Sequence, residues 1–309
     1  MKTRMACGFV VMALFALFFL ACDSRPTKTE KPNTYPHPKD LRTDIAWIVI
    51  EWNGKPKYGG YGSGFLADKH SGSFYTNKHV SDMFDSLGKS SQKIFFNGKV
   101  YNLAVVKVPA LRDAAIVQIT DSFDSSEFPD PAPIAKEKVK KGDKVFVEGF
   151  HPHPYFSRVS NRVEGGYNEK LVPIFKEYYN MGTKNLEKEV EVVFESFTGV
   201  VTKTDALVNF DESSPGVIGR AREIANTYVM IKAEKDHKLS FGGLSGTAVR
   251  NMKGEVIGIF TLAQKKELEA DKEEINQNPD GPIYLKKVYR TFGFTPIESV
   301  SNLKDYLKK

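Results

Sequence analysis

The stretch KIFFNGKVYNLAVVKV (93–108) decides the fold class. Its two apolar runs are separated by Asn97 and Gly98, a dipeptide that favours the tight turn of a β-hairpin. Similar runs of β-branched and aromatic residues recur on both sides, at DIAWIVIEW (44–52), GSFYTNKHV (72–80), DAAIVQI (113–119), DKVFVEGF (143–150), VEVVFESFTGVV (190–201) and TYVMIKAE (227–234). Short strands separated by turns predict an antiparallel all-β barrel or sandwich.

Two segments depart from this pattern. Residues 151–190 are aromatic and partly helix-like, so we expect an insertion with some structure of its own. Near the C-terminus, apolar residues recur at helical spacing, at Ile297, Val300, Leu303 and Leu307. This spacing predicts a single helix over about 295–308.

The N-terminus has the features of an export signal. Lys2 and Arg4 precede an almost purely apolar run over 8–21, which is short for a membrane span. The net charge of the whole chain is +6, and its basic residues are interspersed with acidic ones. Such a surface does not favour nucleic acid as a partner.

The apolar run ends in FLAC (19–22), where a small residue stands directly before Cys22. This arrangement resembles the lipobox of bacterial lipoproteins, although Phe19 stands where the family prefers Leu. The resemblance implies a signal peptide over 1–21, a lipid on Cys22, and an exported protein anchored to a bacterial membrane on its periplasmic or cell-surface side. A plain secretory signal or an uncleaved anchor is the alternative.

The segment 22–42 has the composition of a flexible tether. Four prolines stand among its polar and charged residues, Pro26, Pro32, Pro36 and Pro38, and such a segment cannot bury a core. The chain has two cysteines, Cys7 and Cys22. Because Cys7 lies in the signal, the mature protein is stabilised by its core and not by an intramolecular disulfide.

FGGLSGTAV (241–249) places Ser245 in a glycine-rich turn. A nucleophilic serine needs a base to take its proton and a third group to orient that base. His79 closes a predicted strand among small and apolar neighbours, and Asp113 precedes another. The order His, Asp, Ser is one of the few known for this chemistry. Taken singly, each residue also has an ordinary interpretation, as a loop serine, a structural histidine and a strand-end cap.

Other kinds of site have little support. HPHP (151–154) lacks the neighbouring Cys, Asp or Glu of a zinc site, and GGYGSG (59–64) lacks the Lys-Ser/Thr of a phosphate-binding loop. We therefore expect no cofactor and no metal.

Three regions together resemble the signature regions of chymotrypsin-fold serine proteases, most of all the bacterial high-temperature-requirement (Deg) branch. They are GSGFLADKHSGSFYTNKHV (62–80), RDAAIVQI (112–119) and GGLSGTAVRNMKGEVIGIFT (242–261). In that branch a Gly-Ser-Gly-Phe strand leads to Thr-Asn-x-His-Val, and Gly-x-Ser-Gly precedes a strand–turn–strand unit. The resemblance covers about 45–150 and 190–265 and is absent over the insertion.

The resemblance implies two six-stranded antiparallel β-barrels, at about 43–135 and about 136–290, within a trypsin-like protease domain over 43–309. No PDZ domain is expected, because the chain ends too soon for one. Family members often work as trimers, so a homo-oligomer is possible.

The resemblance also implies the roles of single residues. His79 would be the general base, Asp113 its orienting acid and Ser245 the nucleophile. The backbone N–H groups of Gly243 and Ser245 would form the oxyanion hole, and glycine suits a turn that aims its N–H at a developing charge.

The specificity pocket is expected at four residues: Leu239 at its base, and Ile259, Phe260 and Thr261 along one wall. No acidic residue stands at the base, which favours a small or apolar substrate side chain over a basic one.

The turn itself departs from the family pattern. Leu244 stands where Asn or Asp is usual, and Thr247-Ala248 replaces the usual Gly-Pro, so the shape of the oxyanion loop is open. One hypothesis is a membrane-tethered serine endopeptidase that cleaves protein or peptide substrates through an acyl-enzyme, in extracytoplasmic quality control or processing. The alternative is a catalytically degenerate, protease-fold lipoprotein that acts as a binding module, with 151–190 as its partner surface.

Overall fold

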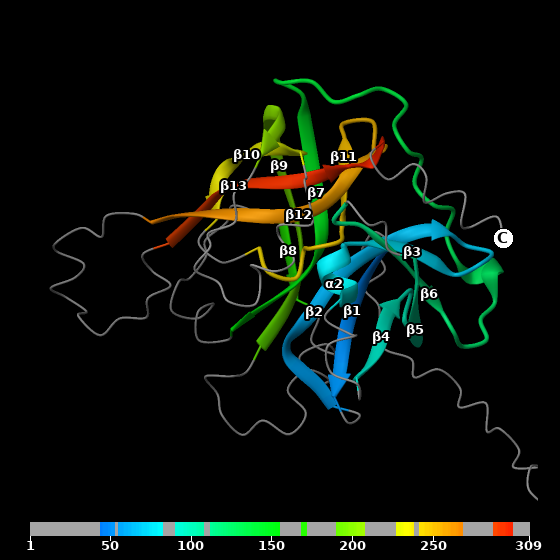
Figure 1. Cartoon of the computed structure of the whole chain (residues 1–309). Helices are drawn as coiled ribbons and strands as arrows, with labels where there is room; N and C mark the ends of the chain where they lie inside the picture. Colours follow the sequence, from blue (N-terminus) through cyan, green and yellow to red (C-terminus); the bar gives the residue numbers. More distant parts are fainter. Residues whose placement is uncertain are drawn as a thin grey trace, which may run out of the picture. The chain divides into compact units, whose positions relative to one another are not determined.

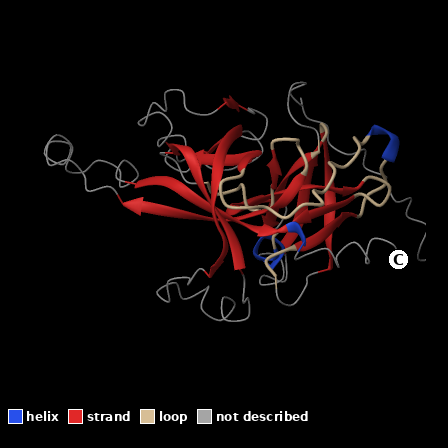
Figure 2. Cartoon of the chain, turned by 90° about the horizontal axis from the view of Figure 1, so that it is seen from above, coloured by secondary structure: helices blue, strands red, loops and turns tan. Residues whose placement is uncertain are grey.

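A computed structural model of the chain describes residues 44–52, 55–82, 90–107, 112–154, 168–171, 190–207, 227–237, 241–267 and 287–298. Strands dominate these ranges (Figures 1 and 2). The helical segments are short, among them α2 (Lys78–Asp82) and the 3-10 turn η2 (Ser125–Glu127). The described part is therefore all-β, as its short apolar runs predicted.

The first six strands form a closed antiparallel barrel. They are β1 (Ile45–Trp52), β2 (Lys55–Asp68), β3 (Ser73–Thr76), β4 (Ser90–Phe96), β5 (Lys99–Lys107) and β6 (Ala115–Ile119). Their order is β1-β2-β3-β6-β5-β4, and the pairing of β4 with β1 closes the barrel.

The Asn-Gly hairpin lies where the sequence predicts it. Asn97 and Gly98 have φ angles of 46° and 79°, and positive φ at both central residues is what a type I′ turn requires. Phe96 pairs with Lys99 across the turn, which joins β4 to β5. The predicted hairpin is confirmed.

The remaining strands form one seven-stranded sheet, and all but β8 close into the second barrel. They are β7 (Lys144–Pro154), β8 (Asn168–Leu171), β9 (Val190–Leu207), β10 (Thr227–His237), β11 (Ala248–Asn251), β12 (Val256–Glu267) and β13 (Lys287–Pro296). The sheet order is β10-β13-β12-β11-β7-β9-β8, and the pairing of β10 with β9 closes six of these strands. The predicted fold of two six-stranded antiparallel barrels is confirmed.

Each barrel has its own apolar core, and a third cluster lies between them. Ile48, Phe74, Ile94 and Val117 are among the residues that fill the first barrel. Val147, Ile231, Phe241 and Phe292 are among those that fill the second. The third cluster combines residues of both barrels, including Phe65, Tyr75, Ala248 and Ile259. Since burial of apolar area is the main stabilising term, this shared cluster holds the two barrels together.

The described residues of the predicted insertion at 151–190 form strands of the second sheet. β7 continues through Pro154, β9 begins at Val190, and β8 pairs with β9. Residues 155–167 and 172–189 lie outside the described ranges. The strands thus extend into what the sequence presented as an interruption.

The C-terminal segment differs in part from expectation. β13 continues to Pro296, past the boundary expected near residue 290, and residues 297–298 form a 3-10 turn. The rest of the helix predicted over about 295–308 lies outside the described residues.

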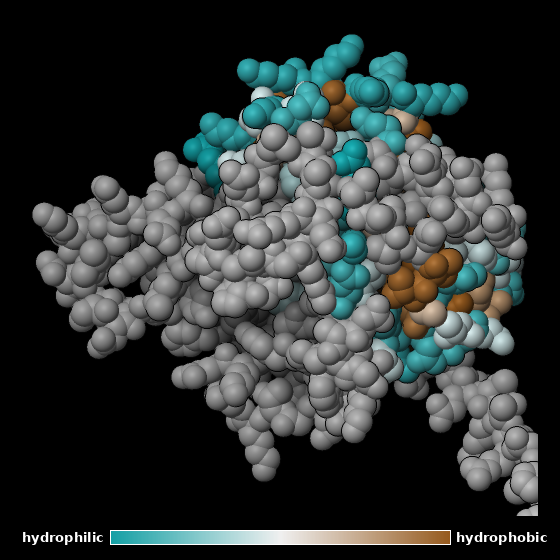
Figure 3. Space-filling model, viewed as in Figure 1, coloured by the Kyte–Doolittle hydropathy of each residue, from teal (hydrophilic) through white to brown (hydrophobic). Residues whose placement is uncertain are grey.

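Hydrophilic residues cover most of the described surface at the top of Figure 3, with a smaller apolar group toward the right. The most exposed large apolar side chains in the described ranges are Val106 and Met252. Isolated apolar side chains of this kind are normal on protein surfaces. None of the helices that the structure describes has the length and apolar character needed to cross a membrane.

Candidate active site

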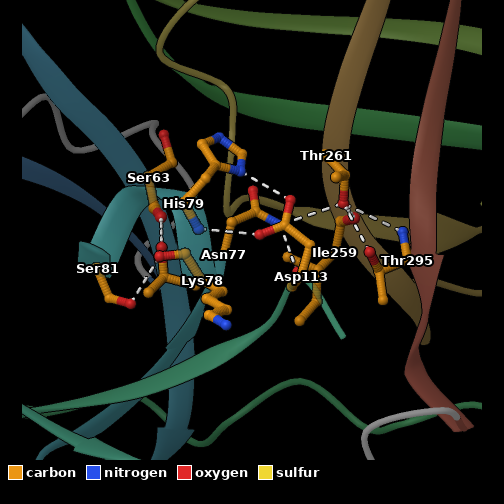
Figure 4. Close-up of polar contacts among 10 residues, drawn as sticks. Ser63, Asn77, Lys78, His79, Ser81, Asp113, Ile259, Thr261 and Thr295 are labelled. Atoms are coloured by element: carbon orange, nitrogen blue, oxygen red, sulfur yellow. Dashed lines mark hydrogen bonds and ion pairs between the residues drawn. The ribbon is translucent and has the colours of Figure 1, made fainter. Parts of the chain in front are cut away.

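His79 and Asp113 meet at one end of the first barrel. His79 lies in α2, three residues after β3 ends at Thr76, and not at the end of the strand itself. Asp113 lies just before β6, which pairs with β3. The Nδ1 atom of His79 is 2.7 Å from Oδ2 of Asp113, and the backbone N–H of His79 donates to Oδ1 at 3.0 Å (Figure 4).

This double contact defines the protonation pattern of the imidazole. The Asp113 carboxylate accepts, so Nδ1 carries the proton and Nε2 keeps a free lone pair in the neutral ring. The Asp113 side chain is 6% exposed, whereas the His79 side chain is 42% exposed. A buried carboxylate therefore orients a ring that reaches the surface.

The pKa of His79 is raised above its ordinary value of 6.5. The partial removal of the ring from water opposes the charged form and is the largest single influence, but the charge and hydrogen bond of Asp113, with a smaller contribution from Asp82, outweigh it. The imidazole thus accepts a proton more readily than a free histidine does.

A polar network behind Asp113 reaches the second barrel. The Asn77 amide Nδ2 donates to the Asp113 carbonyl at 2.9 Å and to Thr261 Oγ1 at 3.1 Å. Thr261 in turn donates to the Ile259 carbonyl at 2.8 Å and shares a 2.9 Å contact with Thr295 Oγ1 (Figure 4). The backbone of Asp113 is therefore linked to the second barrel through Asn77.

Ser245 lies in a tight loop before β11. The N–H of Leu244 donates to the Phe241 carbonyl at 3.2 Å, and the N–H of Thr247 donates to the Leu244 carbonyl at 2.9 Å. Gly243 has a φ of 97°, a conformation that disfavours any residue with a Cβ. The turn thus requires glycine at position 243, because its backbone has this positive φ.

Two backbone donors of this loop are left open. In the described part of the chain, the N–H groups of Gly243 and Ser245 donate no hydrogen bond, and the Ser245 hydroxyl forms none. Buried or half-buried N–H groups are nearly always paired. Two unused donors on either side of Leu244 therefore suit the binding of an acceptor from outside the chain.

Glycines bring this loop close to the residues around His79. A Cβ at Gly62 would lie 2.7 Å from Val80 Cγ1 and 3.2 Å from the Ser245 carbonyl oxygen. A Cβ at Gly246 would lie 2.0 Å from the Ser63 carbonyl oxygen. The loop backbone and the first barrel thus approach within a distance that only glycine permits.

The unusual residues of the loop are part of its internal packing. Leu244 is fully buried in the core cluster of the second barrel. Thr247 is also fully buried, and its hydroxyl donates to the Glu148 carbonyl at 2.5 Å. Both departures from the family pattern are therefore accommodated by contacts that hold the loop.

The residues predicted for the specificity pocket have different surroundings. Ile259 is buried in the cluster between the barrels, and Phe260 is buried in the core of the second barrel. Thr261 belongs to the network behind Asp113. Leu239 lies outside the described residues, so the pocket stays a prediction.

Sequence patterns did not single out Asn77 and Ser63, or the hydrogen bonds that each makes to the second barrel. Both residues stand inside the quoted GSGF and TNKHV segments, but their partners are 184 and 180 residues away. Cys22, the expected lipid site, lies outside the described residues. Within the described ranges, no group of three or more His, Cys, Asp or Glu side chains could hold a metal ion.

Solved structures similar to this chain include two forms of the M. tuberculosis Rv3671c protease. The active form is 16% identical with a TM-score of 0.48, over 84% of this chain and 78% of that chain. The inactive form is 16% identical with a TM-score of 0.46, over 84% and 86%. The serine endoprotease from Yersinia pestis is 16% identical with a TM-score of 0.45, over 86% and 64%.

The comparison with curated proteins finds no match. A family model described as the trypsin-like peptidase domain matches residues 62–259. This span contains His79, Asp113 and the loop of Ser245, and it crosses from the first barrel into the second. The chain belongs to the trypsin-like peptidase domain family.

Proposed function

We propose that this peptidase is a serine endopeptidase with Ser245 as its nucleophile, His79 as its general base and Asp113 as the residue that orients the base. The contact that supports this most is the pair of hydrogen bonds from His79 to the Asp113 carboxylate, 2.7 Å from Nδ1 and 3.0 Å from the backbone. They leave Nε2 free to accept a proton, as the base of a catalytic triad must be.

In the proposed reaction, Ser245 Oγ attacks the carbonyl carbon of the scissile bond while its proton passes to His79 Nε2. The N–H groups of Gly243 and Ser245, which donate no hydrogen bond among the described residues, donate to the resulting oxyanion. The C–N bond then breaks, the Nε2 proton moves to the leaving amine, and an acyl ester remains on Ser245. A water molecule then attacks the ester carbonyl carbon while one of its protons passes to His79 Nε2. The bond from that carbon to Ser245 Oγ breaks, the Nε2 proton returns to Oγ, and the acid product leaves.

The observation that suggested a catalytically degenerate protease has another explanation. That alternative rested on Leu244 and Thr247 as residues that spoil the oxyanion loop, but both are buried and fasten that loop. The endopeptidase proposal is therefore preferred.

The cellular setting is a further part of the proposal. The lipobox-like FLAC (19–22) and the proline-rich segment after it favour a lipoprotein tethered outside the cytoplasmic membrane. It would act on exposed segments of protein or peptide substrates there. Incorporation of a labelled fatty acid, lost in Cys22→Ala, tests the anchor.

The central test is labelling of the full chain, purified in detergent, with a fluorophosphonate probe. The unchanged chain is expected to be labelled, whereas Ser245→Ala and His79→Ala are not. Ser126→Ala is the control, since that serine is exposed and, in the part of the chain that the structure describes, its side chain bonds only to Asp124 in the same turn. Labelling that survives in Ser245→Ala would exclude this residue as the nucleophile, and a folded unchanged chain without labelling would favour the binding module.

A further inference from the structure

Ser63 contacts the oxyanion loop at two points. It lies in β2 of the first barrel and is fully buried. Its hydroxyl donates to the Gly243 carbonyl at 2.8 Å, and its backbone N–H donates to the Ser245 carbonyl at 2.7 Å. These carbonyls lie on either side of Leu244. One residue of the first barrel therefore forms hydrogen bonds with the loop both before and after Leu244.

The two contacts fix alternate peptide units of the loop. A peptide unit is planar, so tying its carbonyl and its N–H removes its freedom to rotate. The unit between Gly243 and Leu244 is tied by Ser63 Oγ and by the Phe241 carbonyl. In the peptide unit between Ser245 and Gly246, the carbonyl accepts the Ser63 N–H. The N–H of the same unit, that of Gly246, donates to a carbonyl of β12 at 2.9 Å.

The peptide unit between these two carries an oxyanion donor. Its carbonyl, that of Leu244, accepts the Thr247 N–H at 2.9 Å. In a trans peptide the N–H points opposite to the carbonyl. The Ser245 N–H is therefore aimed away from Thr247, and within the described part of the chain it donates no hydrogen bond.

Ser63 is itself held from the side of the catalytic base. The hydroxyl of Thr76, three residues before His79, donates to the Ser63 carbonyl at 2.7 Å. The Ser63 hydroxyl has one weaker contact, 3.3 Å to the Phe150 carbonyl. Ser63 thus joins the strand that leads to the base with the loop that carries the nucleophile.

We infer that Ser63 is a positioning residue, whose hydroxyl and N–H hold the oxyanion loop in its working shape from across the barrel interface. This inference rests on the proposed function. It also explains how the loop can have the apolar Leu244 where a polar residue is usual. The hydrogen bonds that hold the loop come from Ser63 in the other barrel.

The test compares Ser63→Ala with Ser73→Ala in the full chain. Ser73 is likewise a buried serine of the first barrel, but among the described residues its hydroxyl bonds only to Ser71, at 2.8 Å. For the fluorophosphonate probe, Ser63→Ala is expected to lower the maximal labelling rate by about 10- to 100-fold, less than the loss of an oxyanion donor. The half-saturating probe concentration and the pH profile should stay unchanged, and Ser63→Thr should label faster than Ser63→Ala.

Amide hydrogen exchange gives a second readout that does not need activity. Ser63→Ala is expected to speed exchange of the Leu244 and Gly246 amides, while Ser73→Ala leaves both protected. Unchanged exchange, or a labelling rate equal to that of Ser73→Ala, would overturn the role of Ser63. If no chain is labelled at all, the proposed function fails, and the exchange result still decides whether Ser63 holds the loop.

Discussion

Asp44 and Arg250 form a buried ion pair that joins the start of the first barrel to β11 of the second across 206 residues. The Arg250 side chain is fully buried, and its Nη1 also donates to the Gly254 carbonyl at 3.1 Å. The Asp44 carbonyl accepts the Leu66 N–H at 2.9 Å. A buried charge is tolerated only when it is paired and hydrogen-bonded, and this pair links the two barrels.

Asp44→Ala is expected to lower the free energy of unfolding by about 3–5 kcal/mol, because it removes one member of a buried ion pair and leaves the other charge in the interior. Urea denaturation measures the change. Asp130→Ala is the control, since its pair with Lys69 at 2.5 Å is exposed and such pairs contribute about 1 kcal/mol or less. Equal losses in the two variants would contradict this prediction.

Activity should depend on pH through His79. Its pKa lies above 6.5, and protonated imidazole cannot take the proton of Ser245. Fluorophosphonate labelling is therefore expected to fall as pH drops through a value above 6.5. Stability should change with pH in the opposite direction. Because the His79 pKa is higher in the folded than in the unfolded state, protonation of His79 stabilises the folded protein at a pH below the unfolded-state pKa. This stabilisation is lost as pH rises through the folded-state pKa.

Asp113→Asn gives the matched variant. Removing the carboxylate charge takes away the main influence that raises the His79 pKa, so the acid limb of the labelling profile should move to lower pH. The rate at its plateau should fall by a factor on the order of 10⁴, as expected when the base has the wrong tautomer. An unmoved acid limb would show that another group controls it.

Local sequence signals predicted the barrels because strand and turn chemistry is local. Asn97 and Gly98 need only their own backbone to make the hairpin. His79 was expected to close a strand, yet β3 ends at Thr76 and α2 carries the histidine. A segment of this length has too few residues for periodicity to distinguish strand from helix.

The long-range parts of the site could not be read from local pattern. Ser63 bonds to Gly243 and Asn77 bonds to Thr261 only because the barrels face each other. From the sequence, Leu244 is an unfavourable neighbour for a nucleophile. Its side chain packs in the core of the second barrel, and no nearby residue in the sequence indicates this. Burial is a property of the packed structure, and it changed the interpretation of that residue.

Gly246→Ala should disrupt the site through its backbone neighbours. The residue has a φ of 95°, and a Cβ would lie 2.0 Å from the Ser63 carbonyl oxygen and 2.4 Å from Thr76 Oγ1. Gly254→Ala is the matched control, with a φ of 85° and no atom within 4 Å. Gly246→Ala is expected to cost about 1–3 kcal/mol more than the control, which is the usual penalty of overpacking.

Denaturation of both glycine variants measures that difference, and probe labelling measures its effect on the loop. Gly254→Ala should keep the labelling rate, because it shares the positive φ but lies at the β11–β12 turn. Similar stability in the two variants would mean that Ser63 and the loop can separate without cost.

Leu244→Asn tests whether the apolar residue before Ser245 anchors the loop. Asparagine is common at this position in the Deg branch and is close to leucine in size, so a loop that merely lacked the family residue would gain activity from it. Leu244 is instead buried among the apolar residues of the second barrel. We expect a loss of about 3 kcal/mol in stability, from lost apolar burial and an amide without partners, together with slower probe labelling.

Leu103→Asn separates the two effects of that change. Leu103 is also a buried leucine, but it lies in the core of the first barrel on β5. Its replacement should lower stability by a similar amount and leave the labelling rate of the folded protein unchanged. Faster labelling of Leu244→Asn than of the unchanged chain would show that the leucine impairs the oxyanion loop, whereas slower labelling confined to Leu244→Asn follows only if the core of the second barrel holds that loop in place.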